Sequence, residues 1–141
     1  MSMRSLRFAG FALALIGALA HAAPLATGIV CHITYGGETR QVTALPVASP
    51  YEVKAIQVGS YFLFRAVVQN APADIAAIKL YVYGDSDAGP VPIHQVDYPY
   101  PPPTLSSKPF GFTGLHRLYE TIRDGELEYW CQWQSGKRTS K

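Results

Sequence analysis

Short segments of alternating apolar and polar residues, each closed by a turn signal, run through the whole chain. Residues 27–35 alternate, with Ile29, Cys31, Ile33 and Tyr35 on one face, and Gly36–Gly37 then supplies the two-residue turn that is typical of a β-hairpin. Similar β-patterned segments follow at residues 38–45, 52–58, 61–69, 78–83, 91–96 and 126–134. An alternating segment buries one face and exposes the other, so many of them favour stacked sheets. The sequence predicts an all-β protein, a seven- or eight-stranded antiparallel β-sandwich.

The chain contains two cysteines, Cys31 and Cys131, which lie near the opposite ends of this β-patterned region. Each falls on the more apolar face of its predicted strand, the first strand and the last. Two cysteines in an exported chain usually pair. We therefore expect a Cys31–Cys131 disulfide, which joins either two neighbouring strands or two sheets.

The N-terminal residues have the composition of a secretory leader. Arg4 and Arg7 precede an uncharged apolar stretch at residues 8–19, which is too short to span a bilayer as a helix. Small residues then offer cleavage after Ala22 or after Ala20. We expect a signal peptide at residues 1–22, one domain at 23–134, and a flexible basic tail at 135–141. The mature protein is expected to be periplasmic or secreted.

Charge excludes several classes of partner. The full chain has twelve basic and ten acidic residues, and two of the basic residues belong to the leader. The mature chain is thus near neutral and has no basic stripe of the kind that binds nucleic acid. We expect no nucleic-acid partner and no membrane span after processing.

The segment 97–114 interrupts the strand pattern and is the best candidate for a binding site. It combines prolines and glycines with four aromatic residues, Tyr98, Tyr100, Phe110 and Phe112. Rigid aromatic loops offer a large contact area at low entropic cost, which favours recognition of a protein or a small ligand. The alternative is structural: the segment wraps over an open sheet and buries these rings in its own core.

The C-terminal part of the domain is expected to close the fold as a hairpin. Residues 115–122 and 126–134 form its strands, and Asp124–Gly125 forms its turn. A short helix over residues 115–123 is the competing interpretation, because apolar residues there also fit a helical stripe. The spacing Leu127-x-Tyr129-x-Cys131, with Asp124 upstream, resembles the late strand of immunoglobulin-type domains. This resemblance covers some eight residues and implies a β-sandwich architecture, with no implication for activity.

Histidines suggest a second class of function. A secreted β-sandwich whose mature chain starts with histidine resembles the copper histidine-brace proteins, which include periplasmic copper carriers and lytic polysaccharide monooxygenases. Cleavage after Ala20 places His21 first, and the resemblance then implies copper bound by His21 together with His94 or His116. The mature chain has no methionine to hold Cu(I). We expect no cofactor, with copper as the alternative.

Hydrolytic chemistry is the third class. Ser106 and Ser107 lie in the long loop, and either His94 with Asp97 or His116 with Glu120 offers a base and its carboxylate. The nucleophile elbow Gly-x-Ser-x-Gly does not occur in the sequence. The leading prediction is thus an exported, non-catalytic binding or accessory domain, and a copper-binding protein and a small secreted hydrolase are the alternatives.

Overall fold

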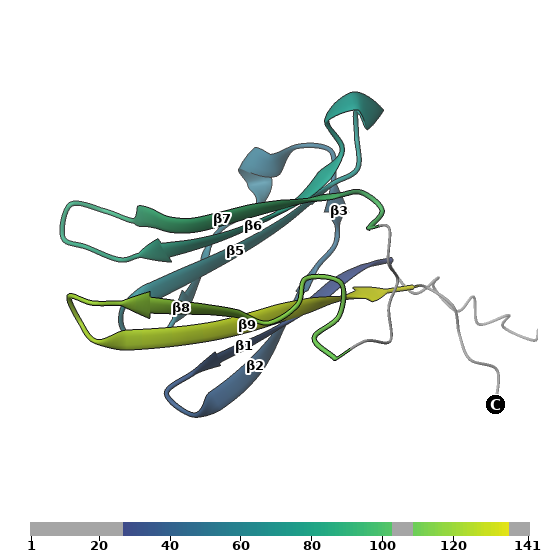
Figure 1. Ribbon diagram of the computed structural model, residues 1–141. Helices are drawn as coiled ribbons and strands as arrows, with labels where there is room; N and C mark the ends of the chain where they lie inside the picture. Colours follow the sequence, from purple (N-terminus) through teal and green to yellow (C-terminus); the bar gives the residue numbers. More distant parts are fainter. Residues whose placement is uncertain (1–26, 103–108, 136–141) are drawn as a thin grey trace, which may run out of the picture.

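The computed structural model describes residues 27–102 and 109–135, which fold into two β-sheets (Figure 1). These residues contain no α-helix; the helical turns are two short 3₁₀ segments, η1 (Pro50–Glu52) and η2 (Ala73–Ile75). The prediction of an all-β protein is confirmed. Within the same residues, no helix has the length and apolar character needed to span a membrane.

The first sheet has four strands in the order β2-β1-β9-β8. Its strands are β1 (Gly28–Tyr35), β2 (Glu38–Ala44), β8 (His116–Glu120) and β9 (Gly125–Gln134). Gly36 and Gly37 connect β1 to β2 with φ values of 61° and 82°, which a two-residue hairpin of this type requires and glycine adopts without strain. The central pair β1–β9 brings the two ends of the described chain together.

The second sheet has the order β3-β5-β6-β7, and β4 also pairs with β5. Its strands are β3 (Pro46–Val47), β4 (Ile56–Val58), β5 (Phe62–Gln69), β6 (Ala77–Gly84) and β7 (Val91–Pro99). The described residues thus form nine strands, where seven or eight were expected. The two-residue β3 also runs parallel to β5, contrary to a purely antiparallel arrangement, because the chain crosses from the first sheet to the second directly after β2.

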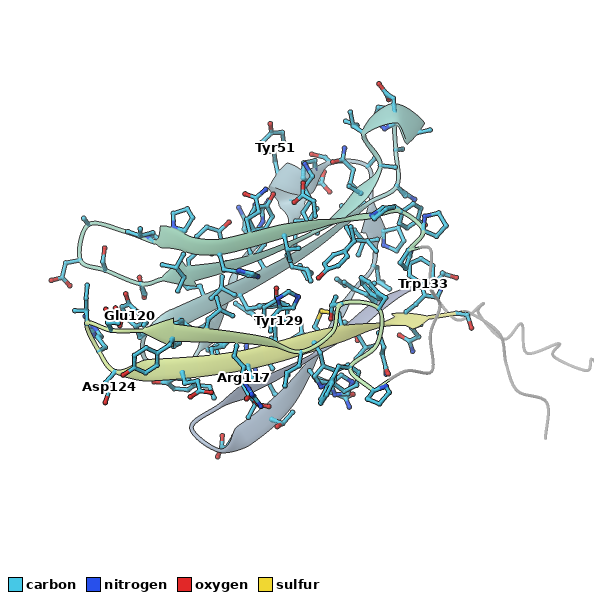
Figure 2. The ribbon with its side chains drawn as sticks, in the orientation of Figure 1. Tyr51, Arg117, Glu120, Asp124, Tyr129 and Trp133 are labelled. Carbon is cyan, nitrogen blue, oxygen red and sulfur yellow. A yellow bond between two sulfur atoms is a disulfide. The ribbon has the colours of Figure 1, made fainter. Side chains whose placement is uncertain are left out.

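The hydrophobic core lies between the two sheets. Alternate residues of β1 and β9 face alternate residues of β5 and β6, as in the contact between the rings of Tyr129 and Phe64 at 5.2 Å. Figure 2 shows Tyr129 in the space between the layers. Full burial of each large side chain stabilises the fold by about 1.5–3 kcal/mol. The core members with no exposed surface include Ile29, Phe62, Phe64, Ile78, Leu80, Val82, Leu127 and Tyr129.

The predicted disulfide between Cys31 and Cys131 is present. The two residues are direct cross-strand partners in the β1–β9 ladder, so the bond links neighbouring strands of one sheet. Both cysteines are fully buried. Of the two arrangements expected from the sequence, the structure selects the link between neighbouring strands.

Two expected boundaries are settled by the structure. Residues His116–Glu120 form strand β8, so the hairpin interpretation of this region is correct and the helical one is wrong. β7 continues to Pro99, so Tyr98 belongs to a strand and not to the loop predicted from residue 97. β7 is the edge of its sheet, where Pro92 and Pro99 need not donate a ladder hydrogen bond on both sides.

Candidate functional site

The segment Pro109–Gly114, which we call the strap, runs along β9 beyond the end of β8. Gly111 bridges Cys131, and the Phe112 amide donates to the Cys131 carbonyl at 3.1 Å. The Cys131 amide in turn donates to Oγ1 of Thr113 at 2.8 Å. The strap therefore takes over the edge of β9 that β8 leaves free, and these hydrogen bonds fix its position.

Glycine is required at the centre of the strap. Gly111 has a φ of 60°, and a Cβ atom there would lie 2.1 Å from the Cys131 carbonyl oxygen. The preceding Phe110 also has a positive φ, 67°. A bulky residue in this left-handed region is a backbone outlier, and it costs roughly 1–2 kcal/mol. These two residues turn the chain so that successive rings of the strap leave in different directions.

Phe112 points into the molecule. Its ring meets the ring of Tyr98 edge to face, at 5.3 Å and 89°, and it packs against the core. Phe110 lies apart from that core cluster and meets Trp130 of β9 at 6.1 Å and 75°. The Phe110 side chain remains 42% exposed. The strap thus contributes one ring to the core and presents another at the surface.

Phe110 completes a row of three rings, Phe110, Trp130 and His32, which we call the aromatic ridge. His32 and Trp130 are cross-strand partners of β1 and β9, and their rings stack at 3.8 Å and 5°. Burial lowers the pKa of His32, so its imidazole is neutral at pH 7. Its Nε2 atom is buried and has no hydrogen-bond partner among the described residues.

The ridge lies on the outer face of the first sheet. Trp130 alternates with the inward-facing Tyr129 and Cys131, and it shares its face with Glu128, the ion-pair partner of Arg117. Figure 2 shows Arg117 on the side of this sheet that faces away from the second sheet. Of the three rings of the ridge, Phe110 is exposed at this face, and His32 and Trp130 are partly buried beside it.

Tyr100 occupies a third position. Its ring contacts Trp133 at 5.8 Å and 62°, and the residue is half-buried against the core. The four rings predicted to form one binding loop are thus divided: Tyr98, Tyr100 and Phe112 pack against the core, and Phe110 lies at the surface.

A second group of residues, the His–Tyr cluster, lies between the edge strands β7 and β8. His94 and Tyr98 come from β7, His116 from β8 and Tyr129 from β9. Nε2 of His94 is 2.7 Å from the Tyr129 hydroxyl, and Nε2 of His116 is 2.9 Å from the Tyr98 hydroxyl. The His116 ring stacks on Tyr129 at 4.8 Å and 11°, and the two histidine rings are 5.3 Å apart.

Burial determines the protonation of this cluster. It raises the pKa of Tyr129, and Tyr98 adds to the effect. Burial also lowers the pKa of His94, which the neighbouring His116 lowers further. Desolvation lowers the pKa of His116, although a hydrogen bond to the Thr113 backbone opposes this. At pH 7 the neutral His94 imidazole and the fully buried Tyr129 hydroxyl share one hydrogen bond, and the imidazole tautomer sets which of the two donates.

The candidate metal and hydrolase residues are only partly brought together. His94 and His116 are neighbours, whereas His21 lies outside the described residues. No group of three or more His, Cys, Asp or Glu residues within residues 27–102 and 109–135 is arranged to hold a metal ion.

The carboxylates proposed for hydrolysis have other partners. The Glu120 carboxylate accepts the amides of Ile122 and Arg123 at the β8–β9 turn, and Asp97 lies 4.0 Å from Lys79. Ser106 and Ser107 fall outside the described residues. In the described part of the chain, neither predicted histidine–carboxylate pair is joined by a hydrogen bond or ion pair.

Little in the sequence indicates the ridge. The alternation in the first and last strands places His32 and Trp130 on outward faces, but their contact follows from the β1–β9 register, which links residues almost a hundred positions apart. Comparison with models of known protein families, with curated proteins and with solved structures finds no match for this chain.

Proposed function

We propose that this protein is an exported, non-catalytic binding domain of immunoglobulin-like β-sandwich architecture, and that the aromatic ridge is its contact surface. The observation that carries the proposal is Phe110, a half-exposed ring held at a positive φ against Trp130. Backbone outliers of this kind concentrate at ligand contacts, because the surrounding structure must stabilise them. The disulfide and the predicted leader support export to the periplasm or the medium.

The form of the ridge favours a protein partner. His32 covers one face of the Trp130 ring, and Phe110 meets that ring nearly at right angles. The face of Trp130 that His32 covers is therefore not available for a flat small molecule to stack on. A half-exposed aromatic ring packed on a tryptophan, on a face that also carries the polar residues Arg117 and Glu128, is typical of hot spots in protein interfaces.

Site-specific photo-crosslinking tests this proposal. A benzophenone amino acid replaces Phe110 in the exported protein, and a matched variant carries it at Tyr51, which is 85% exposed and lies in η1, outside the first sheet. We expect a discrete crosslinked product from position 110 and none from position 51. Equal crosslinking at both positions, or none at position 110, contradicts the proposal.

Copper binding is a second candidate, supported by the neighbouring positions of His94 and His116. The 5.3 Å between their rings suits two ligands of one ion, and neutral imidazole is the form that binds metal. If copper binding is the function, the mature chain begins at His21 and binds one Cu(II) tightly, and His94→Ala or His116→Ala abolishes that binding. N-terminal sequencing combined with Cu(II) titration decides between the two functions.

A further inference from the structure

The two lateral sides of the molecule, where the edges of the two sheets meet, differ in construction. On the side of β7 and β8 the His–Tyr cluster fills the space between the sheets. β7 also carries Pro92 and Pro99, and its register with β6 shifts between Val82 and Tyr83. Prolines and bulges are the features by which edge strands resist pairing with another chain.

On the opposite side, formed by β2 of the first sheet and by β3 and β4 of the second, Pro46 lies in β3, whereas β2 lacks this protection. β2 pairs with β1 in an unbroken register of seven residue pairs, from Ile29–Ala44 to Tyr35–Glu38, and contains no proline. Among the described residues no strand pairs with its other edge. Because hydrogen-bonding groups alternate along an antiparallel strand, every second residue of β2 directs its N–H and C=O away from β1.

Two hollows lie beside β2, between it and the second sheet. The larger has a volume of about 250 Å³ and is walled by apolar side chains that include Val42 and Ala44 of β2 and Phe64 of β5. Lys54 lies at the same hollow. The smaller hollow, of about 160 Å³, is lined by Arg40 of β2 and by core residues including Val58. A dry apolar cavity of roughly 150 Å³ holds a benzene ring, so each hollow has room for a side chain.

The spacing of the hollows matches an extended chain. The larger hollow borders residues 42–45 of the β2 segment and the smaller borders residues 38–40, so their centres lie about four residues apart. At about 3.3 Å per residue this is roughly 13 Å, the distance between side chains i and i+4 on one face of a strand.

We propose that β2 and these two hollows bind an extended peptide segment of another protein, which adds as a fifth strand to the first sheet. The peptide carries an apolar side chain in the larger hollow and a second side chain, four residues away, in the smaller. Main-chain hydrogen bonds supply affinity in this mode of recognition and the hollows supply sequence preference.

The charges along β2 define the peptide further. Arg40 and Lys54 form no ion pair with any described residue, and Glu38 is the acidic residue lining the smaller hollow. Glu38 lies beside Arg40 at the smaller hollow, whereas Lys54 lines the larger hollow. A carboxylate on the peptide is therefore favoured at the larger hollow, beside Lys54. A free row of backbone groups also selects for a peptide over a compact small ligand, which has no matching row of donors and acceptors.

Selection of peptides tests the proposal. Random 12-residue peptides displayed on phage are selected on the purified exported protein, and the enriched peptide is synthesised with a fluorescent label. We expect enriched sequences with apolar residues at i and i+4 and an acidic residue next to one of them. Failure to enrich any peptide, or enrichment without this spacing, overturns the proposal.

Backbone methylation of the selected peptide provides the sharper readout, because it leaves the protein untouched. N-methylation at the residues whose amides face β2 is expected to weaken binding at least tenfold, and methylation at the intervening residues is expected to leave it unchanged. Equal effects in both registers contradict strand addition. Val42→Lys, which places a charge in the larger hollow, should also weaken binding, whereas Gln41→Lys on the opposite face of β2 should not.

The same peptide separates this site from the ridge. Phe110→Ala is expected to leave its affinity unchanged, because Phe110 lies on the outer face of β9 and not at β2. Loss of peptide binding in Phe110→Ala assigns the peptide to the ridge and refutes strand addition at β2.

Discussion

Removal of the disulfide is expected to cost the protein much of its stability. The bond joins residues 100 positions apart in the sequence, and the chain-entropy model assigns about 5 kcal/mol to a closed loop of that length. Domains of this size have total stabilities of roughly 5–15 kcal/mol. The double variant Cys31→Ala with Cys131→Ala is therefore expected to be marginally stable.

The position of the bond explains why the full effect is expected. β1 and β9 form the central pair of the first sheet and align eight residue pairs, from Gly28–Gln134 to Tyr35–Leu127. That pairing closes the longest loop in the domain, and an unlinked unfolded chain must lose the corresponding entropy when it folds. With the disulfide in place, the unfolded chain has already lost this loop-closure entropy.

Urea unfolding of the oxidised protein and the double variant measures the difference. At about 4–8 °C per kcal/mol, we also expect a melting temperature lower by roughly 20–40 °C. Because both sulfurs are fully buried, dithiothreitol should reduce the bond rapidly only in denaturant. A double variant within about 1 kcal/mol of the wild type, or two free thiols in protein purified without reductant, would refute this reasoning.

Three further predictions concern the strap and the His–Tyr cluster. Burial lowers the pKa of His94 and His116 below 6.5, so as the pH falls these histidines bind protons in the unfolded chain before they do so in the folded protein. The free energy of unfolding should therefore fall from about pH 7 to pH 5. His94→Gln should reduce that fall, and urea unfolding midpoints at each pH measure it. Phe112→Ala should destabilise the fold by about 2–3 kcal/mol and Phe110→Ala by less than about 1 kcal/mol, measured by thermal unfolding; equal losses contradict the division of the strap. Gly111→Ala should lower the melting temperature and displace the strap, because its Cβ meets the Cys131 carbonyl, and unchanged amide exchange at residue 112 would argue against this.

Local chemistry made several features of the fold predictable. Gly36–Gly37 identified the first hairpin. The last hairpin was also predicted, but its turn covers residues 121–124 and ends at Asp124, which has a φ of 54°, whereas Gly125 begins β9 opposite Glu120. The paired faces of Cys31 and Cys131 predicted the disulfide. The hairpin inferences depend on a few adjacent residues whose conformational preferences are strong, and the disulfide inference depends on the even cysteine count and on the alternation within each strand.

The aromatic ridge could not be predicted from any short stretch of the sequence. In a regular strand Phe110 and Phe112 share a face, since they are two residues apart. The positive φ values of Phe110 and Gly111 break this alternation and send the rings to opposite sides of the sheet. The partners of these rings, Trp130 and Tyr98, are set by a sheet order that brings sequence-distant strands together.

The affinity of the crosslinked partner for Phe110→Ala is the most direct test of the ridge as the contact surface. The partner identified through position 110 is purified, and its binding to the wild type and to Phe110→Ala is measured by calorimetry, with the melting temperature of each recorded alongside. We predict affinity at least tenfold weaker in Phe110→Ala, about 1.4 kcal/mol or more, with the melting temperature nearly unchanged. Equal affinity of the two proteins would contradict the ridge as the contact surface.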